Sequence, residues 1–306
     1  MTVLRIGTRG SPLALYQAHA VKAALAAADP DLAGPAAIEI VVIRTTGDRV
    51  QDRTLSEIGG KGLFTKEIEE QLADGSIDLA VHSMKDVPTI LPEGLVIDAM
   101  LPRADPRDAL VALVPGGVEA LPRGAVVGTA SLRRQAQLLH LRPDLRVVPF
   151  RGNVDTRLAK LAAGNAVATV LALAGLARLG KAGVATAILE PETMLPAVAQ
   201  GAIGIERRAD DAKAAERVAR INDHATAVAV AAERAFLAVL DGSCRTPIAA
   251  LAELDGNGGL ALRGLVAAPD GSRIVSGAWR GPISEAERIG AMAGAELRAR
   301  APFLDA

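Results

Sequence analysis

Cysteine is almost missing from this chain of 306 residues, in which Cys244 is the single cysteine. One thiol cannot form a disulfide within the chain, and this scarcity is typical of proteins from a reducing compartment. The chain also lacks a run of about 18 uncharged apolar residues, the length that a membrane-spanning helix needs. Its first residues, MTVLRIGTRGSPLAL, contain neither the apolar run nor the cleavage site of a signal peptide. We therefore expect a cytoplasmic protein that does not enter a membrane.

An excess of one charge is missing too. The 34 lysines and arginines are balanced by 35 aspartates and glutamates, which gives a formal net charge of -1. This balance argues against general affinity for nucleic acids or anionic membranes. Aromatic residues make up only 2% of the chain, although half of its residues are hydrophobic. A chain of this length and composition can bury the cores of two or three domains.

The common nucleotide, metal and hydrolase motifs are absent. GGKG at 59–62 lacks the upstream glycine and the following Ser or Thr of a P-loop, and no GxGxxG follows the first expected strand. GxSxG and HExxH do not occur. The four histidines are scattered, without the spacing of metal ligands: His19, His82, His140 and His224. We expect neither a metal ion nor a nucleotide.

Short apolar segments alternate with helical segments through the first two-thirds of the chain, the pattern of a parallel α/β sheet. The candidate strands in this region are 4–7, 38–43, 77–82, 95–100, 109–113, 125–129, 145–150 and 168–173. Capping residues indicate that helices begin at Ser11, Ser131 and Asn153. A further helix is expected near 64–72 and ends at an Asp-Gly pair.

Two proline-rich segments, 101–108 and 190–201, interrupt this alternation and indicate crossings between domains. The strand-like segment 201–206 would then return the chain to the first domain. From about His224 the pattern changes to a long helix, antiparallel-looking strands and a closing helix. The expected fold class is α/β, with two α/β lobes joined by paired hinges and a small C-terminal α+β domain. The expected domains are 1–101 with 202–220, then 106–195, and finally 223–306.

Arginines stand where helices are expected to begin, beside the caps Ser11, Ser131 and Asn153. They are Arg9, Arg133, Arg134, Arg151 and Arg157. A cation at a helix N-terminus opposes the macrodipole and costs about 0.3–1 kcal/mol, unless an anion binds there. Each of these helices follows a strand, so its start should lie at the carboxyl ends of the strands, where open α/β sheets bind ligands. The pattern predicts an arginine-lined cleft for a ligand with many negative groups. The alternative is that each arginine is a solvated surface residue.

The segment HSMKDVP at 82–88 ends an apolar strand and places Asp86 at its carboxyl end, beside Lys85. A carboxylate among cations stays ionised and can stabilise a positive centre or relay a proton. The alternative is a loop aspartate bonded to local backbone amides. His82 is expected to be packed or hydrogen-bonded rather than catalytic.

Cys244 lies in the loop DGSCRTPI, between an expected helix and an expected strand. A lone cysteine is commonly a buried apolar residue. A loop containing glycine and serine is an unusual place to bury a thiol, however, and Arg245 would favour the thiolate. Because no cysteine-hydrolase signature surrounds it, the other interpretation is covalent attachment of a group.

Together these segments resemble the porphobilinogen deaminase (hydroxymethylbilane synthase) family, whose signature segments they match in order. The matching segments are TRGSPLALYQA, GGKGLFTKE, HSMKDVP, DPRDAL, GTASLRRQAQL, RGNVDTRL, LALAGLARLG and LPAVAQGAIGIE. The resemblance covers nearly the whole chain and is most specific through residue 206. In the last domain the loop DGSCRTPIA carries it.

The resemblance implies a fold and a reaction. The two lobes would be periplasmic-binding-protein-like, the third domain would bear the attachment cysteine, and the protein would be a monomer. The enzyme would be a transferase of tetrapyrrole (heme) biosynthesis. It would condense four porphobilinogen molecules head to tail into hydroxymethylbilane, with release of ammonia. Each pyrrole carries an acetate and a propionate, which is the kind of ligand that an arginine-lined cleft would bind.

The resemblance also assigns residues. A dipyrromethane cofactor would be bound by a thioether to Cys244. Asp86 would be catalytic, stabilising the cation left by loss of ammonia and bonding the pyrrole NH groups. Further cofactor contacts would come from Ser83, Lys85, Asp86, Ser131, Arg133 and Arg134. Substrate would be bound by Arg9, Ser11, Gln17, Lys61, Phe64, Arg151, Asn153, Arg157, Arg178 and Gln200.

The sequence departs from some relatives at Glu57, where a basic residue can stand, and at Ser243 and Arg245, where Gly and Gln are common. Two other functions fit part of the pattern. A non-catalytic two-lobed anion-binding protein or sensor would use the hinges and arginines, but it would need a secretion signal or a DNA-binding helix-turn-helix. A thiolate-dependent transferase would use Cys244 as a transient nucleophile.

Overall fold

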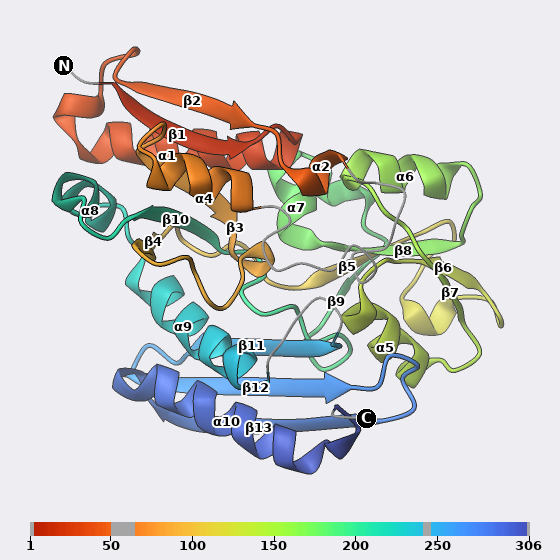
Figure 1. Cartoon of the computed structure of the whole chain (residues 1–306). Helices are drawn as coiled ribbons and strands as arrows, with labels where there is room; N and C mark the ends of the chain where they lie inside the picture. Colours follow the sequence, from red (N-terminus) through yellow and green to blue (C-terminus); the bar gives the residue numbers. More distant parts are fainter. Residues whose placement is uncertain (1–2, 50–64, 241–245, 305–306) are drawn as a thin grey trace. The chain divides into compact units, whose positions relative to one another are not determined.

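The computed structural model describes residues 3–49, 65–240 and 246–304, which divide into two compact units (Figure 1). The described residues of the first unit are 3–49, 65–104 and 201–227, and those of the second are 105–200 and 228–304. The chain passes from one unit to the other at 104/105 and at 200/201. Both points lie within the two proline-rich segments of the sequence.

A five-stranded sheet forms the centre of the first unit, in the order β2-β1-β3-β10-β4. Its strands are β1 (Leu4–Arg9), β2 (Ile38–Ile43), β3 (Leu79–Ser83), β4 (Leu95–Met100) and β10 (Ile203–Arg208). β1 pairs in parallel with β2 and β3, whereas β10 is antiparallel to both β3 and β4. The expectation that all strands of this sheet run parallel is therefore wrong for β10. This is the first strand after the chain returns to the unit, and it begins at Ile203, opposite the carboxyl end of β3 at Ser83.

Helices cover both faces of this sheet. α1 (Pro12–Ala28) and α8 (Ala212–Ala219) share one apolar core with the sheet, and α4 (Lys66–Ala73) packs in a second core. The short α2 (Thr46–Arg49) follows β2. The Ser11 hydroxyl caps α1 by accepting a hydrogen bond from the Ala14 amide, and Pro12 occupies the first turn. The capping residue thus predicted the start of α1 correctly, and the helix buries Gln17, Ala18, Val21 and Leu25.

The second unit repeats the arrangement, with the strand order β7-β6-β8-β5-β9. Its strands are β5 (Asp108–Ala112), β6 (Val126–Gly128), β7 (Arg146–Val148), β8 (Ala168–Ala172) and β9 (Ala187–Leu189). β6 pairs in parallel with β7 and β8, and β5 is antiparallel to its neighbours β8 and β9. Here too the reversed strand is the first one after a crossing, and it begins at the carboxyl end of β8. One core includes α5 (Leu132–Leu141), and another includes α6 (Val154–Ala162) and α7 (Leu173–Arg178).

The last part of the chain forms a three-stranded antiparallel sheet with two helices (Figure 1). Its elements are α9 (His224–Val239), β11 (Ile248–Leu254), β12 (Gly259–Ala267), β13 (Ile274–Pro282) and α10 (Ala286–Arg300). Phe236 of α9 is fully buried, with its ring centroid 6.4 Å from that of Trp279. Ala136 of α5 shares a buried cluster with Leu251 and Leu265 of this sheet. The expected fold class, two α/β lobes and a small C-terminal α+β domain, is confirmed.

Candidate functional site

In the first unit, the carboxyl ends of two neighbouring parallel strands lie beside the start of α1. Strands β1 and β3 end at Arg9 and Ser83, and Ser11 caps α1 directly after β1. A pocket opens at this edge of the sheet, lined by Arg9, Ser11, Leu13, Ala14, Gln17, Thr65, Val81, His82, Ser83 and Asp86. Five residues predicted from the sequence are thereby brought together: Arg9, Ser11, Gln17, Ser83 and Asp86.

Polar contacts organise this pocket. Gln17 is only 2% exposed, and its side-chain Nε2 donates to the Ser83 hydroxyl at 2.8 Å. This bond joins α1 to the end of β3. The chain then turns through a short 3-10 helix, Met84–Asp86, in which Lys85 and Asp86 are exposed. An accessible carboxylate thus shares a pocket with an arginine and the hydroxyl groups of Ser11, Thr65 and Ser83, a setting that suits a ligand with a developing positive charge.

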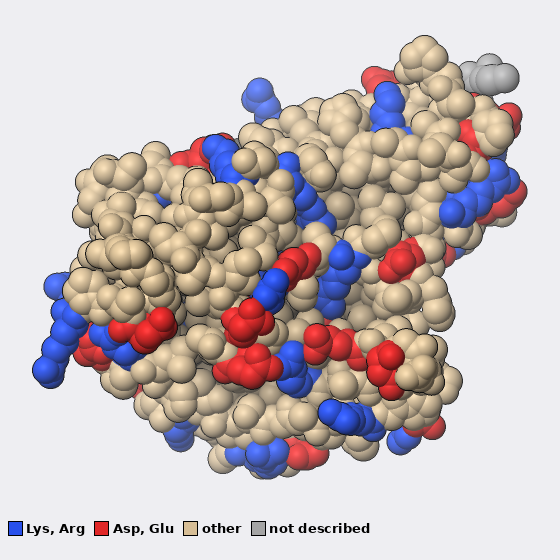
Figure 2. Space-filling view, turned by 180° about the vertical axis from the view of Figure 1, so that it is seen from behind, with Lys and Arg blue, Asp and Glu red and all other residues tan. Residues whose placement is uncertain are grey.

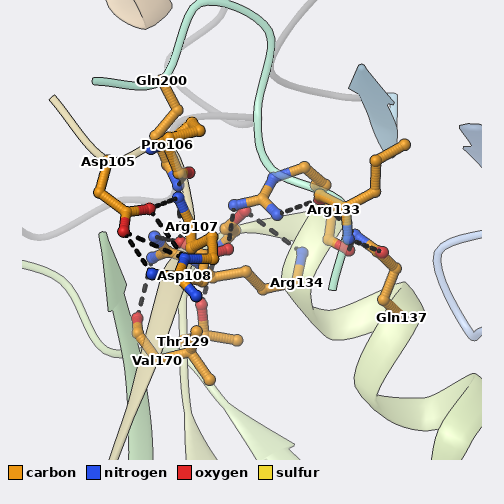
Figure 3. Close-up of polar contacts among 12 residues, drawn as sticks. Asp105, Pro106, Arg107, Asp108, Thr129, Arg133, Arg134, Gln137, Val170 and Gln200 are labelled. Carbon is orange, nitrogen blue, oxygen red and sulfur yellow. Dashed lines mark hydrogen bonds and ion pairs between the residues drawn. The ribbon is translucent and has the colours of Figure 1, made fainter. Parts of the chain in front are cut away.

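In the second unit, the arginines at the start of α5 are buried rather than solvated. Arg133 and Arg134 are 6% and 5% exposed. Both reach the carboxylate of Asp108, Arg133 through Nη2 at 2.8 Å and Arg134 through Nη2 at 2.7 Å (Figure 3). The other Nη of each donates to a backbone carbonyl, of Leu195 and of Val170 respectively. Ser131 caps the same helix by accepting from the Arg134 amide.

Asp108 is the first residue of β5 and is fully buried. Burial by itself would raise the pKa of its carboxyl group, but the charges and hydrogen bonds of Arg133 and Arg134 hold that pKa well below its usual range. Gln200, which is 1% exposed, donates to Asp108 Oδ1 at 2.9 Å and to the Pro106 carbonyl at 2.7 Å (Figure 3). One carboxylate therefore faces two guanidinium groups, and the described cluster carries a net positive charge away from water.

No role for Asp108 was expected from the sequence, although it lies in DPRDAL, one of the segments that resemble the family. One sequence feature could have indicated Asp108. It is a charged residue at the first position of an apolar strand, directly after the segment in which the chain passes between the two units. Such a residue lies at the sheet edge where α5 begins.

A second group of arginines lies around the start of α6. Asn153 caps this helix through the Thr156 amide, and Arg157 donates through Nε to the Gly152 carbonyl at 3.0 Å. Arg151, just before the cap, has a buried Nη1 without a hydrogen-bond partner among the described residues. Arg134 Nε is buried without such a partner too. Arg178 ends α7 and is half-buried.

Three predicted site residues, Lys61, Phe64 and Cys244, lie outside the described residues. Within those that the structure describes, no group of three or more His, Cys, Asp or Glu side chains could hold a metal ion. Basic and acidic side chains alternate over the face shown in Figure 2, in line with the balanced charge of the chain. The buried arginines of α5 bring two positive charges to the single carboxylate of Asp108.

Family models and sequence relatives match nearly the whole of this chain. The family model described as porphobilinogen deaminase, dipyromethane cofactor binding domain, matches residues 4–216, and the one for the porphobilinogen deaminase C-terminal domain matches residues 227–299. A porphobilinogen deaminase from Paracoccus denitrificans is 60% identical over 299 residues, covering 98% of this chain and 95% of the relative. A chloroplastic porphobilinogen deaminase from Oryza sativa is 54% identical, covering 98% of this chain and 85% of the relative. Among solved structures, a periplasmic substrate-binding protein of an ABC transporter from Coxiella burnetii is 13% identical, with a TM-score of 0.44, covering 76% of this chain and 97% of that one.

Proposed function

This chain belongs to the porphobilinogen deaminase family, and we propose which of its residues carry the reaction of that family. The enzyme is a transferase of tetrapyrrole biosynthesis. It condenses four porphobilinogen molecules head to tail into hydroxymethylbilane, releases ammonia and works with a bound dipyrromethane. The observation that carries the residue assignment is the pocket in which Asp86 lies with Arg9, Ser11, Gln17 and Ser83.

The described residues fit a dipyrromethane, whose pyrroles carry acetate and propionate groups. Buried Arg134 Nε and Arg151 Nη1 have no hydrogen-bond partner among the described residues, and a buried guanidinium N–H without an acceptor is destabilising. Carboxylates would provide the missing acceptors. The residues that would hold the cofactor are Ser83, Lys85, Asp86, Ser131, Arg133, Arg134 and, by a thioether, Cys244. When bound, the dipyrromethane supplies the free pyrrole carbon to which the first substrate is joined.

Asp86 is the catalytic residue in this proposal. When the aminomethyl group of porphobilinogen loses ammonia, the C–N electron pair leaves with nitrogen and the remaining carbon becomes electron-poor. An ionised carboxylate beside that carbon stabilises the positive charge and can accept hydrogen bonds from pyrrole NH groups. The Asp86 side chain is exposed at the pocket, so substrate can reach it.

We assign binding of the acetate and propionate groups of the substrate to residues of the first unit and to residues of the second. The polar residues of the first unit are Arg9, Ser11, Gln17 and the segment with Lys61 and Phe64. Those of the second are Arg151, Asn153, Arg157, Arg178 and Gln200. Arginines suit this task because a guanidinium group binds a carboxylate through two parallel hydrogen bonds.

The test of the assignment is Asp86→Asn, which keeps the size of the side chain and removes its charge. We expect turnover of porphobilinogen to fall by about 100-fold or more, with an unchanged unfolding transition. Glu93→Gln is the matched control, because Glu93 is an exposed carboxylate nearby in the chain that does not line the pocket. Near-normal turnover in Asp86→Asn would remove Asp86 from the mechanism.

The enzyme works as a cytoplasmic monomer in this proposal. None of the described helices is long and apolar enough to cross a membrane. Resemblance to the family supports the monomer, and the single cysteine supports a reducing compartment. Light scattering of the purified enzyme tests the monomer, for which a mass near 31.4 kDa is expected.

A further inference from the structure

The segment 149–153, between β7 and α6, carries Arg151, whose Nη1 is buried without a hydrogen-bond partner among the described residues. The segment contains no helix or strand, so its backbone must be held by contacts of another kind. An arginine side chain is long and flexible, and it places its guanidinium group precisely only when the backbone that carries it is fixed. The contacts of this segment therefore decide how well Arg151 is oriented.

Two cationic side chains of α6 reach back to the backbone of this segment. Arg157 donates through Nε to the Gly152 carbonyl at 3.0 Å, and Lys160 donates through Nζ to the Arg151 carbonyl at 3.1 Å. The Lys160 bond spans nine residues, so it belongs neither to the hydrogen-bond ladder of the helix nor to its cap, which is Asn153. The backbone of Arg151 is thus fixed by a side chain of the helix that follows it.

The residue before Arg151 gives Lys160 a second contact. Phe150 is 3% exposed and shares a buried cluster with Leu161 of α6. Its ring packs against the backbone of Gly128 at the end of β6, where an added Cβ would lie 2.3 Å from the ring. Lys160 Nζ lies 5.9 Å from the centre of this ring, within the range of a cation–π attraction. Lys160 therefore connects an anchored ring to the carbonyl of the next residue.

Lys160 makes no ion pair with a carboxylate among the described residues. Asp155, the acidic residue in the first turn of the same helix, pairs with Lys181 instead. The Lys160 side chain is half-buried, and its hydrogen bond and its ring contact are both with residues 150–151. These contacts indicate that Lys160 serves this segment rather than the solvated surface.

We propose that Lys160 is a positioning residue, which fixes the backbone of Arg151 so that its guanidinium group can bind a carboxylate of the growing pyrrole chain. The inference rests on the proposed function of Arg151 and adds the group that orients it. Lys160 acts through Arg151 and does not touch the substrate. Its loss should therefore impair the elongation step that uses Arg151 and no other step.

The experiment follows the enzyme-bound intermediates by single-turnover mass spectrometry in Lys160→Met, in Arg151→Gln and in the double variant. Lys160→Met keeps the unbranched stem and removes the ammonium group. We expect it to slow the same elongation step as Arg151→Gln, by about tenfold, with the unfolding midpoint little changed. The double variant should elongate at the rate of Arg151→Gln alone, because two residues that act as one unit are not additive.

Two further variants serve as controls. Lys160→Arg keeps a donor on a long side chain and should restore most of the elongation rate. Lys181→Met also removes a lysine that contacts α6, but through Asp155, and it should elongate normally. If Lys160→Met does not fold, Lys160→Ser, whose short side chain cannot reach the Arg151 carbonyl, is compared in the same way.

The outcomes separate this inference from the proposed function. Natural elongation in Lys160→Met beside altered elongation in Arg151→Gln would overturn the inference and leave the proposed function intact. A double variant slower than either single variant would mean that Lys160 acts independently of Arg151, which also overturns it. Unaltered elongation in both single variants would remove Arg151 from the substrate site, and Lys160 with it.

Discussion

Asp108 Oδ2 accepts a hydrogen bond from Arg133 Nη2 at 2.8 Å, and both side chains are buried. Arg134 approaches the other carboxylate oxygen at 2.7 Å. These ion pairs connect the first turn of α5, where cations oppose the helix dipole, to Asp108, the first residue of β5. This relationship keeps two guanidinium groups in place without exposing them to water.

Removal of the carboxylate should destabilise the second unit. In Asp108→Asn two buried guanidinium groups lose their common counterion, which costs about 3–5 kcal/mol of unfolding free energy. Denaturant unfolding measures this loss. The control is Asp105→Asn, which breaks a partly exposed ion pair with Arg107 and should cost about 1 kcal/mol or less. Equal losses in the two variants would contradict the role given to Asp108.

The contribution of Asp108 to the free energy of unfolding should decrease as the pH falls into the acid range. The pKa of its carboxyl group is lowered in the folded state, so the ionised form stabilises the fold above the unfolded-state pKa of about 3.9. This stabilisation is lost as the pH falls from there towards the folded-state pKa. The difference in unfolding free energy between the natural chain and Asp108→Asn should be constant above about pH 5 and narrow below about pH 4. A difference that does not narrow in acid would be inconsistent with a lowered pKa.

The attachment of the cofactor is testable by intact-protein mass spectrometry. The purified enzyme should carry a stable mass excess equal to two pyrrole units, and brief exposure to porphobilinogen should add further units. Cys244→Ser should lack the excess, because only a thiolate at this position forms the thioether. Active enzyme with the bare polypeptide mass would rule out the covalent dipyrromethane.

Arg151 should affect elongation rather than folding. Its Nη1 is buried without a partner among the described residues, so Arg151→Gln removes a donor that we assign to a substrate carboxylate. We expect enzyme-bound intermediates with fewer pyrroles to accumulate in a single-turnover mass spectrum, with the unfolding midpoint little changed. Arg146→Gln, at an exposed position on β7, should elongate normally. An unaltered series of intermediates in Arg151→Gln would remove this residue from the substrate site.

Local features of the chain predicted much of the fold. The capping residues Ser11, Ser131 and Asn153 are N-caps in the structure, and each accepts a hydrogen bond from a backbone amide of its helix. The short apolar segments of the first two-thirds became strands, and the proline-rich segments contain the two points at which the chain passes between the units. These predictions succeed because capping and strand formation depend on residues close together in the chain.

Directions and pairings over long distances required the tertiary structure. The sequence alone determined that arginines stand at helix starts and that Asp86 follows a strand, because both depend on neighbours in the chain. Only the folded chain decided that β5 and β10 run against their sheets, since their direction depends on where each crossing enters. It also decided that Asp108 meets Arg133 and Arg134 and that Glu206 meets His82. Such partners lie 25 to 124 residues apart in the chain, and no local sequence pattern indicates which buried charges will be neighbours.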